Sequence, residues 1–218
     1  MNAKKITVAG LVALVALFFY LGLNAYQKQT QAAQEVQVKA EQTRLVRMHS
    51  PVFGPQGAPV TIVEFFDPAC ETCRAFYPLV KKLMAQYPND VRLVIRYAPL
   101  HPGSDQVVKL LEAAKIQGKY ETVFEAVLAA QPAWADHAQP NIETAFKVAE
   151  QAGLDLVKAR QDIEKPGLQS LVRQDIEDLT ALQVTKTPTF FVNGRSLPSF
   201  GPDQLAALVA EEVAKARK

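Results

Sequence analysis

The two cysteines of this chain, Cys70 and Cys73, form a C-x-x-C motif between a predicted strand and a predicted helix. Residues 60–66, just before the motif, are apolar, β-branched and aromatic, which indicates a buried strand. After the motif, apolar residues recur with helical spacing over residues 74–87. Cys70 is therefore predicted at the amino end of a helix, where free N–H groups and the helix dipole stabilise a thiolate. This arrangement indicates a dithiol for thiol–disulfide exchange.

Two other roles of a C-x-x-C motif are half of a zinc site and a purely structural disulfide. Zinc usually takes four Cys or His ligands, but the chain has no further cysteine. Its three histidines, His49, His101 and His137, are scattered without ligand spacing. A disulfide across two intervening residues closes a very small loop and adds little entropic stabilisation. We therefore expect no metal site, and redox activity is the favoured interpretation.

The amino-terminal 26 residues predict export. Residues 6–23 form an uncharged apolar run of 18 residues behind Lys4 and Lys5. This length favours an uncleaved membrane anchor, because a bilayer needs about 20 residues and the apolar core of a signal peptide has about 7–15. A cleaved signal peptide is the alternative. In both cases the lysines stay in the cytoplasm and the chain beyond is exported to an oxidising compartment, which suits a lone cysteine pair.

Beyond this run the charge is balanced. Lys and Arg total 24 and Asp and Glu total 22, and Lys4 and Lys5 account for the whole excess. Nothing in this balance indicates a nucleic-acid surface. Residues 27–49 are polar and rich in Gln and Ala, which indicates a linker or stalk. Residues 50–218 are sufficient for one domain with a substantial core.

The remaining elements follow from periodicity and from the placement of Gly and Pro. A second strand is predicted at residues 91–97, and a block of helices occupies about residues 104–183. Two short strands around an Asn-Gly turn predict a hairpin at residues 189–197. Pro202 begins a last amphipathic helix. The order predicts an α/β sheet protein with an inserted helical subdomain.

With these elements in place, the sequence resembles the thioredoxin superfamily, and within it the DsbA-like branch. The resemblance covers residues 50–218 and rests on the strand at residues 57–66, the C-x-x-C motif and the run VTKTPTFFVNG at residues 184–194. The helical block at residues 104–183 matches the insertion typical of this branch. The resemblance implies a thioredoxin fold, in which helices flank a central mixed sheet. Here a transmembrane helix (residues 1–26) and a polar stalk would precede it.

The resemblance implies a role for each motif residue. Cys70 would be the nucleophile that forms mixed disulfides with a client, and Cys73 would be the resolving thiol. Pro188 would be a cis-proline facing the disulfide, and Thr187 would offer its backbone to a client peptide. An X-Pro bond is also where a cis peptide costs least free energy.

Glu64 stands inside an otherwise apolar strand, six positions before Cys70. Buried carboxylates are costly unless they are paired or protonated, so a Glu at this place needs a reason. The resemblance implies a buried acid that assists proton transfer at the resolving cysteine. Burial would raise its pKa toward the range useful for a general base. The alternative is a Glu at a sheet edge that reaches solvent.

Glu71 and Thr72, between the cysteines, differ from the Pro and His that are common in strongly oxidising members of the family. The negative charge of Glu71 should disfavour the Cys70 thiolate, an effect that Arg74 could offset. A less stabilised thiolate makes a less oxidising disulfide. Redox tuning by Glu71 and Thr72 is therefore predicted to lower the reduction potential below that of the strong oxidants.

Three functions are compatible with these motifs. The favoured one is an exported dithiol oxidase, with the Cys70–Cys73 disulfide in place of a cofactor, which acts on cysteine-containing client proteins and is reoxidised by a membrane redox partner. A reductase or isomerase kept reduced by a membrane donor is the alternative, and a non-catalytic module that binds a client or a metal is the third. The implied location is the bacterial periplasm. The protein would be anchored to the inner membrane by its amino-terminal helix or, after signal cleavage, soluble.

Overall fold

The computed structural model describes residues 19–24 and 42–218. Residues 19–24 are helical. Across both described ranges, no helix is at once long and apolar enough to cross a membrane. Residues 1–18 and 25–26 of the predicted anchor and residues 27–41 of the predicted stalk lie outside the described residues.

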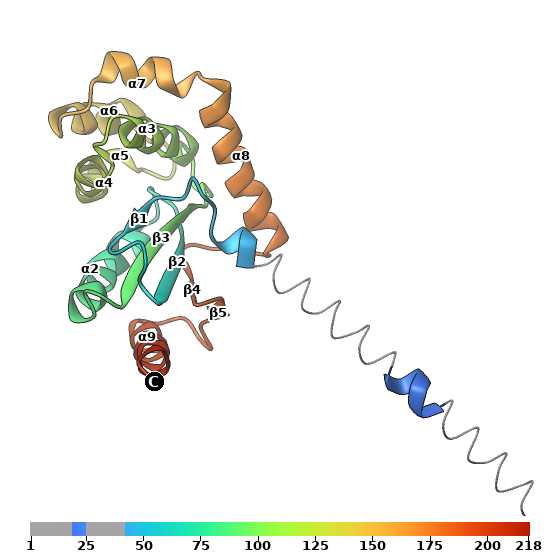
Figure 1. Ribbon diagram of the computed structural model, residues 1–218. Helices are drawn as coiled ribbons and strands as arrows, with labels where there is room; N and C mark the ends of the chain where they lie inside the picture. The colour runs from blue at the N-terminus through green and yellow to red at the C-terminus, as the bar shows by residue number, and fades with distance from the viewer. Residues whose placement is uncertain (1–18, 25–41) are drawn as a thin grey trace, which may run out of the picture. The chain divides into compact units, whose positions relative to one another are not determined.

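The compact unit Arg44–Lys218 is built on a mixed sheet with the strand order β1-β3-β2-β4-β5 (Figure 1). The central strands β2 and β3 pair in parallel, and the other neighbours pair antiparallel. The predicted strands are present, and β1 adds a two-residue strand that is too short to produce a sequence pattern. The strands are β1 (Val52–Phe53), β2 (Val60–Phe66), β3 (Val91–Tyr97), β4 (Thr189–Val192) and β5 (Arg195–Ser196).

The helices follow the predicted order. In Figure 1 the inserted helices α3 to α7 gather beyond one end of the sheet, and α8 runs back toward it. The four-residue helix α5 was not predicted, because one turn shows no periodicity. The helices are α2 (Glu71–Gln86), α3 (Ser104–Ile116), α4 (Tyr120–Ala129), α5 (Gln131–Trp134), α6 (Ile142–Gln151), α7 (Leu156–Ile163), α8 (Pro166–Ala181) and α9 (Pro202–Ala216).

Both faces of β2 are buried, which explains its almost continuous apolar sequence. Successive side chains of a strand point to opposite faces. Ile62 and Phe66 pack into the main core with α2, α9 and the inserted helices. Val63 and Phe65 pack into a second core that includes Leu179 of α8. Glu64 has the parity of Ile62 and Phe66 and therefore faces the main core, on the side of α2.

The hairpin between β4 and β5 has the predicted two-residue turn. Phe191 pairs with Ser196 and Val192 with Arg195, which leaves Asn193 and Gly194 to form the turn. Both turn residues have positive φ, 49° and 81°. A type I′ hairpin requires these angles, and Asn-Gly adopts them at low cost.

A buried ion network joins β3, α8 and the segment before β1. The fully buried Arg96 guanidinium lies 2.8 Å from Asp175 and 2.7 Å from Asp178. Arg47 lies 2.6 Å from Asp178, and His49 lies 2.8 Å from Asp175. Residues 44–49, which the sequence analysis assigned to the linker, therefore belong to the compact unit. Their partners on α8 lie more than 120 positions away, so no local pattern shows this.

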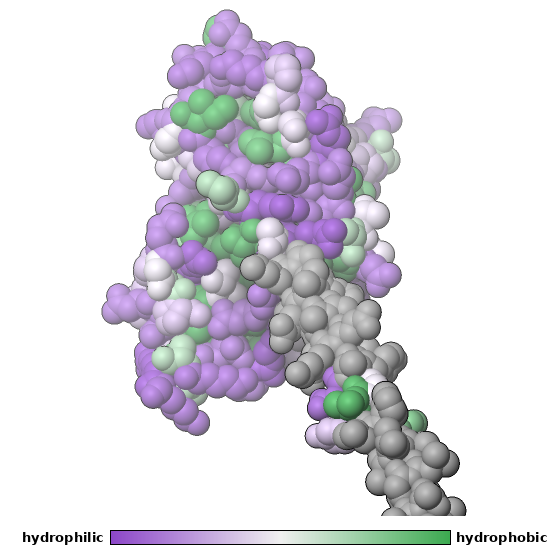
Figure 2. Space-filling view, turned by 45° about the vertical axis from the view of Figure 1, so that its right-hand side comes forward, coloured by the Kyte–Doolittle hydropathy of each residue, from purple (hydrophilic) through white to green (hydrophobic). Residues whose placement is uncertain are grey.

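The face of the molecule in Figure 2 is mostly hydrophilic, with apolar side chains in small separate areas. Scattered exposed apolar side chains are ordinary for a folded protein. The chemistry that this fold supports is therefore sought in the cysteine motif and its surroundings.

Replacing Arg96 with Met is expected to lower the free energy of unfolding by about 3–5 kcal/mol, because two buried carboxylates lose a shared cation. Urea unfolding monitored by circular dichroism measures this change. Arg160→Met is the control, since it breaks an exposed ion pair with Glu143 and should cost much less. Equal losses in the two variants would contradict a structural role for the buried network.

Candidate active site

Cys70 is the N-cap residue of α2, directly after the loop that leaves the carboxyl end of β2. Cys73 lies in the first turn of the same helix. Both cysteines are free thiols, and their exposed fractions are 5% for Cys70 and 0% for Cys73. Cys70 is therefore the more accessible of the two cysteines.

The segment before β4 lies against Cys70. The Cys70 Sγ is 3.4 Å from the carbonyl oxygen of Thr187, 117 positions along the chain. The antiparallel pairing of β4 with β2 brings the two segments together, with Phe65 opposite Thr189. The Thr187–Pro188 peptide bond is cis, as predicted.

The two thiols differ strongly in acidity. The pKa of Cys70 is lowered to about 5, above all by a hydrogen bond from the Cys73 thiol. Thr187 and the backbone N–H groups of Thr72 and Cys73 add to this effect, which outweighs the opposing effect of burial. Burial raises the pKa of Cys73, and its hydrogen bond to Cys70 raises it further. At neutral pH the reduced pair therefore holds a Cys70 thiolate beside a protonated Cys73.

That Glu71 disfavours this thiolate stays a prediction, and the structure shows what surrounds the Glu71 charge. The Glu71 carboxylate Oε1 lies 2.9 Å from His137 Nε2. Its charge is not among the main causes that set the pKa of Cys70. Arg74 does not approach Glu71; its Nε donates to Gln131 Oε1 at 2.9 Å. The thiolate is stabilised because its hydrogen bonds are direct, whereas Glu71 faces a histidine.

Glu64 is fully buried on β2, so the alternative of a solvent-exposed edge residue is excluded. Among the residues that the structure describes, neither carboxylate oxygen has a hydrogen-bond partner. Burial raises the pKa of Glu64 well above its usual value, and the charge of Cys70 adds to the rise. The Glu64 charge in turn raises the pKa of Cys73. The carboxyl group is therefore protonated under conditions in which an exposed Glu would be ionised.

Asp67 and Gln131 hold the active-site loop, and the sequence analysis did not identify them. Asp67 is fully buried and accepts hydrogen bonds from the backbone N–H groups of Ala69, Leu100 and His101 at 2.7–2.9 Å. Gln131 of α5 donates to the carbonyl oxygens of Pro68 and Cys70 at 2.8 and 3.0 Å. The sequence could have indicated Asp67, because it is an acid that directly follows a buried strand. No local sequence feature indicates the role of Gln131.

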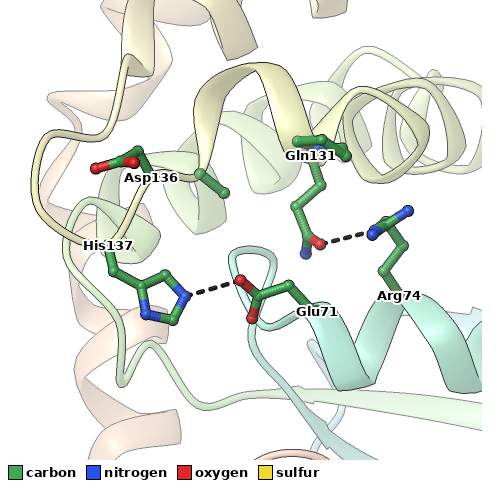
Figure 3. Close-up of a pocket in the computed structure, with 7 residues that line it drawn as sticks. Glu71, Arg74, Gln131, Asp136 and His137 are labelled. Atoms are coloured by element: carbon green, nitrogen blue, oxygen red, sulfur yellow. Dashed lines mark hydrogen bonds and ion pairs between the residues drawn. The ribbon is translucent and has the colours of Figure 1, made fainter.

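A polar hollow of about 370 Å³ lies between α2 and the inserted helices (Figure 3). In Figure 3, His137 points toward Glu71, and Arg74 points toward Gln131. Two of the three histidines come together in space, since the rings of His101 and His137 lie 5.1 Å apart. In the described parts of the chain, no group of three His, Cys, Asp or Glu residues is placed to hold a metal ion. The hollow is lined by Glu71, Arg74, Gln131, Pro132, Ala135, Asp136 and His137.

Comparison with known proteins decides the family. A family model described as thioredoxin matches residues 47–211. The chain belongs to the thioredoxin family. A thioredoxin-like oxidoreductase from Silicibacter pomeroyi DSS-3 is 31% identical with a TM-score of 0.68, covering 80% of this chain and 96% of that one. The predicted membership of the thioredoxin superfamily is confirmed, and this relative is an oxidoreductase, as the sequence analysis expected of the chain.

Other relatives of this thioredoxin-family chain differ in length and description. The thiol–disulfide exchange protein alpha-DsbA2 from Wolbachia pipientis shares the fold, with a TM-score of 0.66 at 18% identity over 82% of this chain and 97% of that one. A Na⁺/H⁺ antiporter NhaA 3 from Salinispora tropica is 35% identical over 162 residues, or 73% of this chain. The match covers only 24% of that antiporter, so this chain spans about a quarter of its length.

The reactivity of Cys70 should follow its low pKa. The rate of alkylation by iodoacetamide is expected to rise with pH and reach half of its plateau near pH 5, where the thiol ionises. Mass spectrometry of the reduced protein at pH 7 should find the label on Cys70 and not on Cys73. A midpoint near pH 8–9, the range of an ordinary thiol, would contradict the stabilised thiolate.

Glu64→Leu should raise the free energy of unfolding at pH 7 by about 1–3 kcal/mol, because it removes a buried polar group without partners. The raised pKa fixes the sign of the pH dependence. The contribution of Glu64 to the stability of the wild type is fully present below pH 4.5 and is lost as the pH rises toward the folded-state pKa, and the variant lacks this loss. Urea unfolding between pH 4 and pH 8 measures it, and parallel pH profiles of the two proteins would contradict the assignment.

Proposed function

We propose that this protein is an exported dithiol oxidase that donates its Cys70–Cys73 disulfide to cysteine-containing client proteins. The difference in acidity between the two thiols is the single observation that carries the proposal. A dithiol whose reduced form holds a stabilised thiolate is easily reduced, so its disulfide is a strong oxidant. A thiolate with a low pKa is also a good leaving group for passing a disulfide to a client.

The first step forms a mixed disulfide. A client thiolate attacks the Cys70 sulfur, a bond forms between these two atoms, and the Cys70–Cys73 bond breaks. The electron pair of the broken bond goes to Cys73, which takes up a proton because burial raises its pKa. Glu64, buried and protonated, supplies that proton and later recovers one from solvent.

The second step releases the oxidised client. A second client thiolate attacks the client sulfur of the mixed disulfide, and Cys70 leaves with the bonding electrons as a thiolate. The client has then lost two electrons and two protons, and the protein holds one thiolate and one thiol. A membrane redox partner accepts the two electrons and restores the disulfide.

Thr187 and Pro188 complete the site as the place where the client chain docks. The Thr187 carbonyl lies beside the Cys70 sulfur, at the start of a strand. An extended client segment would pair with this backbone, and the client cysteine would then lie over Cys70.

The proposed location is the bacterial periplasm. A periplasmic thioredoxin-like protein from Salmonella enterica serovar Typhimurium shares the fold, with a TM-score of 0.62 at 18% identity. The uncharged run at residues 6–23 supports export and anchorage to the inner membrane. Anchorage would keep the domain near a membrane redox partner.

Trapping the cysteines in living cells tests the direction of electron flow. Acid quenching followed by alkylation should find the Cys70–Cys73 pair mostly as a disulfide. Cys73→Ala should accumulate mixed disulfides with clients through Cys70, since the resolving thiol is missing, and Cys70→Ala/Cys73→Ala is the control that should form none. A pair found mostly as dithiol would instead favour a reductase or isomerase, and no mixed disulfides would favour a binding module.

A further inference from the structure

Glu71 is paired with a residue of the helical insertion. Its carboxylate, next to Cys70 in the first turn of α2, lies 2.9 Å from His137 Nε2. His137 stands 66 positions later, in the loop between α5 and α6. Figure 3 shows the two side chains, which both line the polar hollow, pointing toward each other. An acid beside the nucleophilic sulfur therefore faces a group that can carry the opposite charge.

A second histidine stands beside this pair. The ring of His101 lies 5.1 Å from that of His137, and its Nδ1 lies 2.7 Å from the carboxylate of Asp67. Burial lowers the pKa of His101, but Asp67 and the charges of Cys70 and Glu71 outweigh this, and the net shift is upward. Cys70 therefore lies within electrostatic reach of this histidine cluster.

The loop that carries His137 is held in place by hydrogen bonds of residues on either side of it in the sequence. Gln131 of α5 is anchored on the carbonyl oxygens of Pro68 and Cys70, and it accepts a hydrogen bond from Arg74. Asp136 accepts hydrogen bonds from the N–H groups of Ala138 and Gln139 at 2.9 and 2.8 Å, which shapes the turn. The position of His137 thus follows from the packing of the insertion onto the cysteine loop.

We propose that His137 is a redox-tuning residue that the helical insertion supplies to the cysteine motif: its ring, in hydrogen-bond contact with the Glu71 carboxylate, offsets the Glu71 charge and so preserves the Cys70 thiolate. The inference deepens the proposed function, because it names the group that keeps an acid between the cysteines compatible with an oxidising disulfide. The charged and titratable groups around the pair are Asp67, Arg74, His101 and Asp136. The side chains of Glu71 and His137 are 58% and 57% exposed, so solvent limits the size of the effect.

The test is a double-mutant cycle on the purified full-length protein with the variants His137→Gln, Glu71→Gln and their combination. The pKa of Cys70 is read from the thiolate absorbance, and the oxidising strength from equilibrium with glutathione. His137→Gln should raise the proton affinity of Cys70 about two- to fivefold. The less stabilised thiolate should make the disulfide a weaker oxidant, so the equilibrium constant for glutathione oxidation should fall. Glu71→Gln should lower the proton affinity of Cys70, and His137→Gln should have a smaller effect in its background.

Two controls separate tuning from a structural role. Arg160→Gln removes a cation from a comparably exposed pair between α6 and α7 and should leave the Cys70 pKa unchanged. In 1 M salt the effect of His137→Gln should shrink, because the interaction is electrostatic.

An unchanged Cys70 pKa in His137→Gln, or an equal shift with and without Glu71, would overturn the proposal. These readouts use purified protein, so a mostly reduced pair in cells would refute the oxidase and leave this inference standing.

Discussion

The hydrogen bonds received by the Cys70 sulfur are the interaction on which the chemistry of this protein depends. The Cys73 thiol and the first N–H groups of α2 converge on one sulfur, and they outweigh the cost of burying its charge. The same geometry leaves Cys73 buried and protonated. The start of α2 therefore gives two identical side chains different properties: Cys70 is a leaving group and Cys73 is a resolving thiol.

The rest of the fold serves to bring distant segments to that helix start. Antiparallel pairing of β4 with β2 carries Thr187 to the Cys70 sulfur, and β2 itself places Glu64 in the core on the side of α2. The insertion does more than enlarge the domain, since Gln131 holds the carbonyl oxygens before α2 and His137 faces Glu71. A plain strand–helix unit would supply the dithiol without these partners.

The sequence was sufficient to predict those parts of the structure that show a periodic pattern or carry a motif. The strand at Val60–Phe66, the hairpin at Asn193 and the cis bond before Pro188 are local or family patterns, and the structure has them. The surroundings of Glu71 could not be predicted, because in the sequence its charge stands without a partner. Its partner His137 comes from the insertion, and a side-chain pairing across 66 positions leaves no periodic trace.

The central claim is that the stabilised Cys70 thiolate makes this disulfide an oxidant despite Glu71. Equilibration of the wild-type protein with mixtures of reduced and oxidised glutathione measures its reduction potential directly. The account predicts a value above about −180 mV, on the oxidising side of protein disulfide isomerase. A value near about −270 mV, as in thioredoxin, would contradict it and identify a reductant.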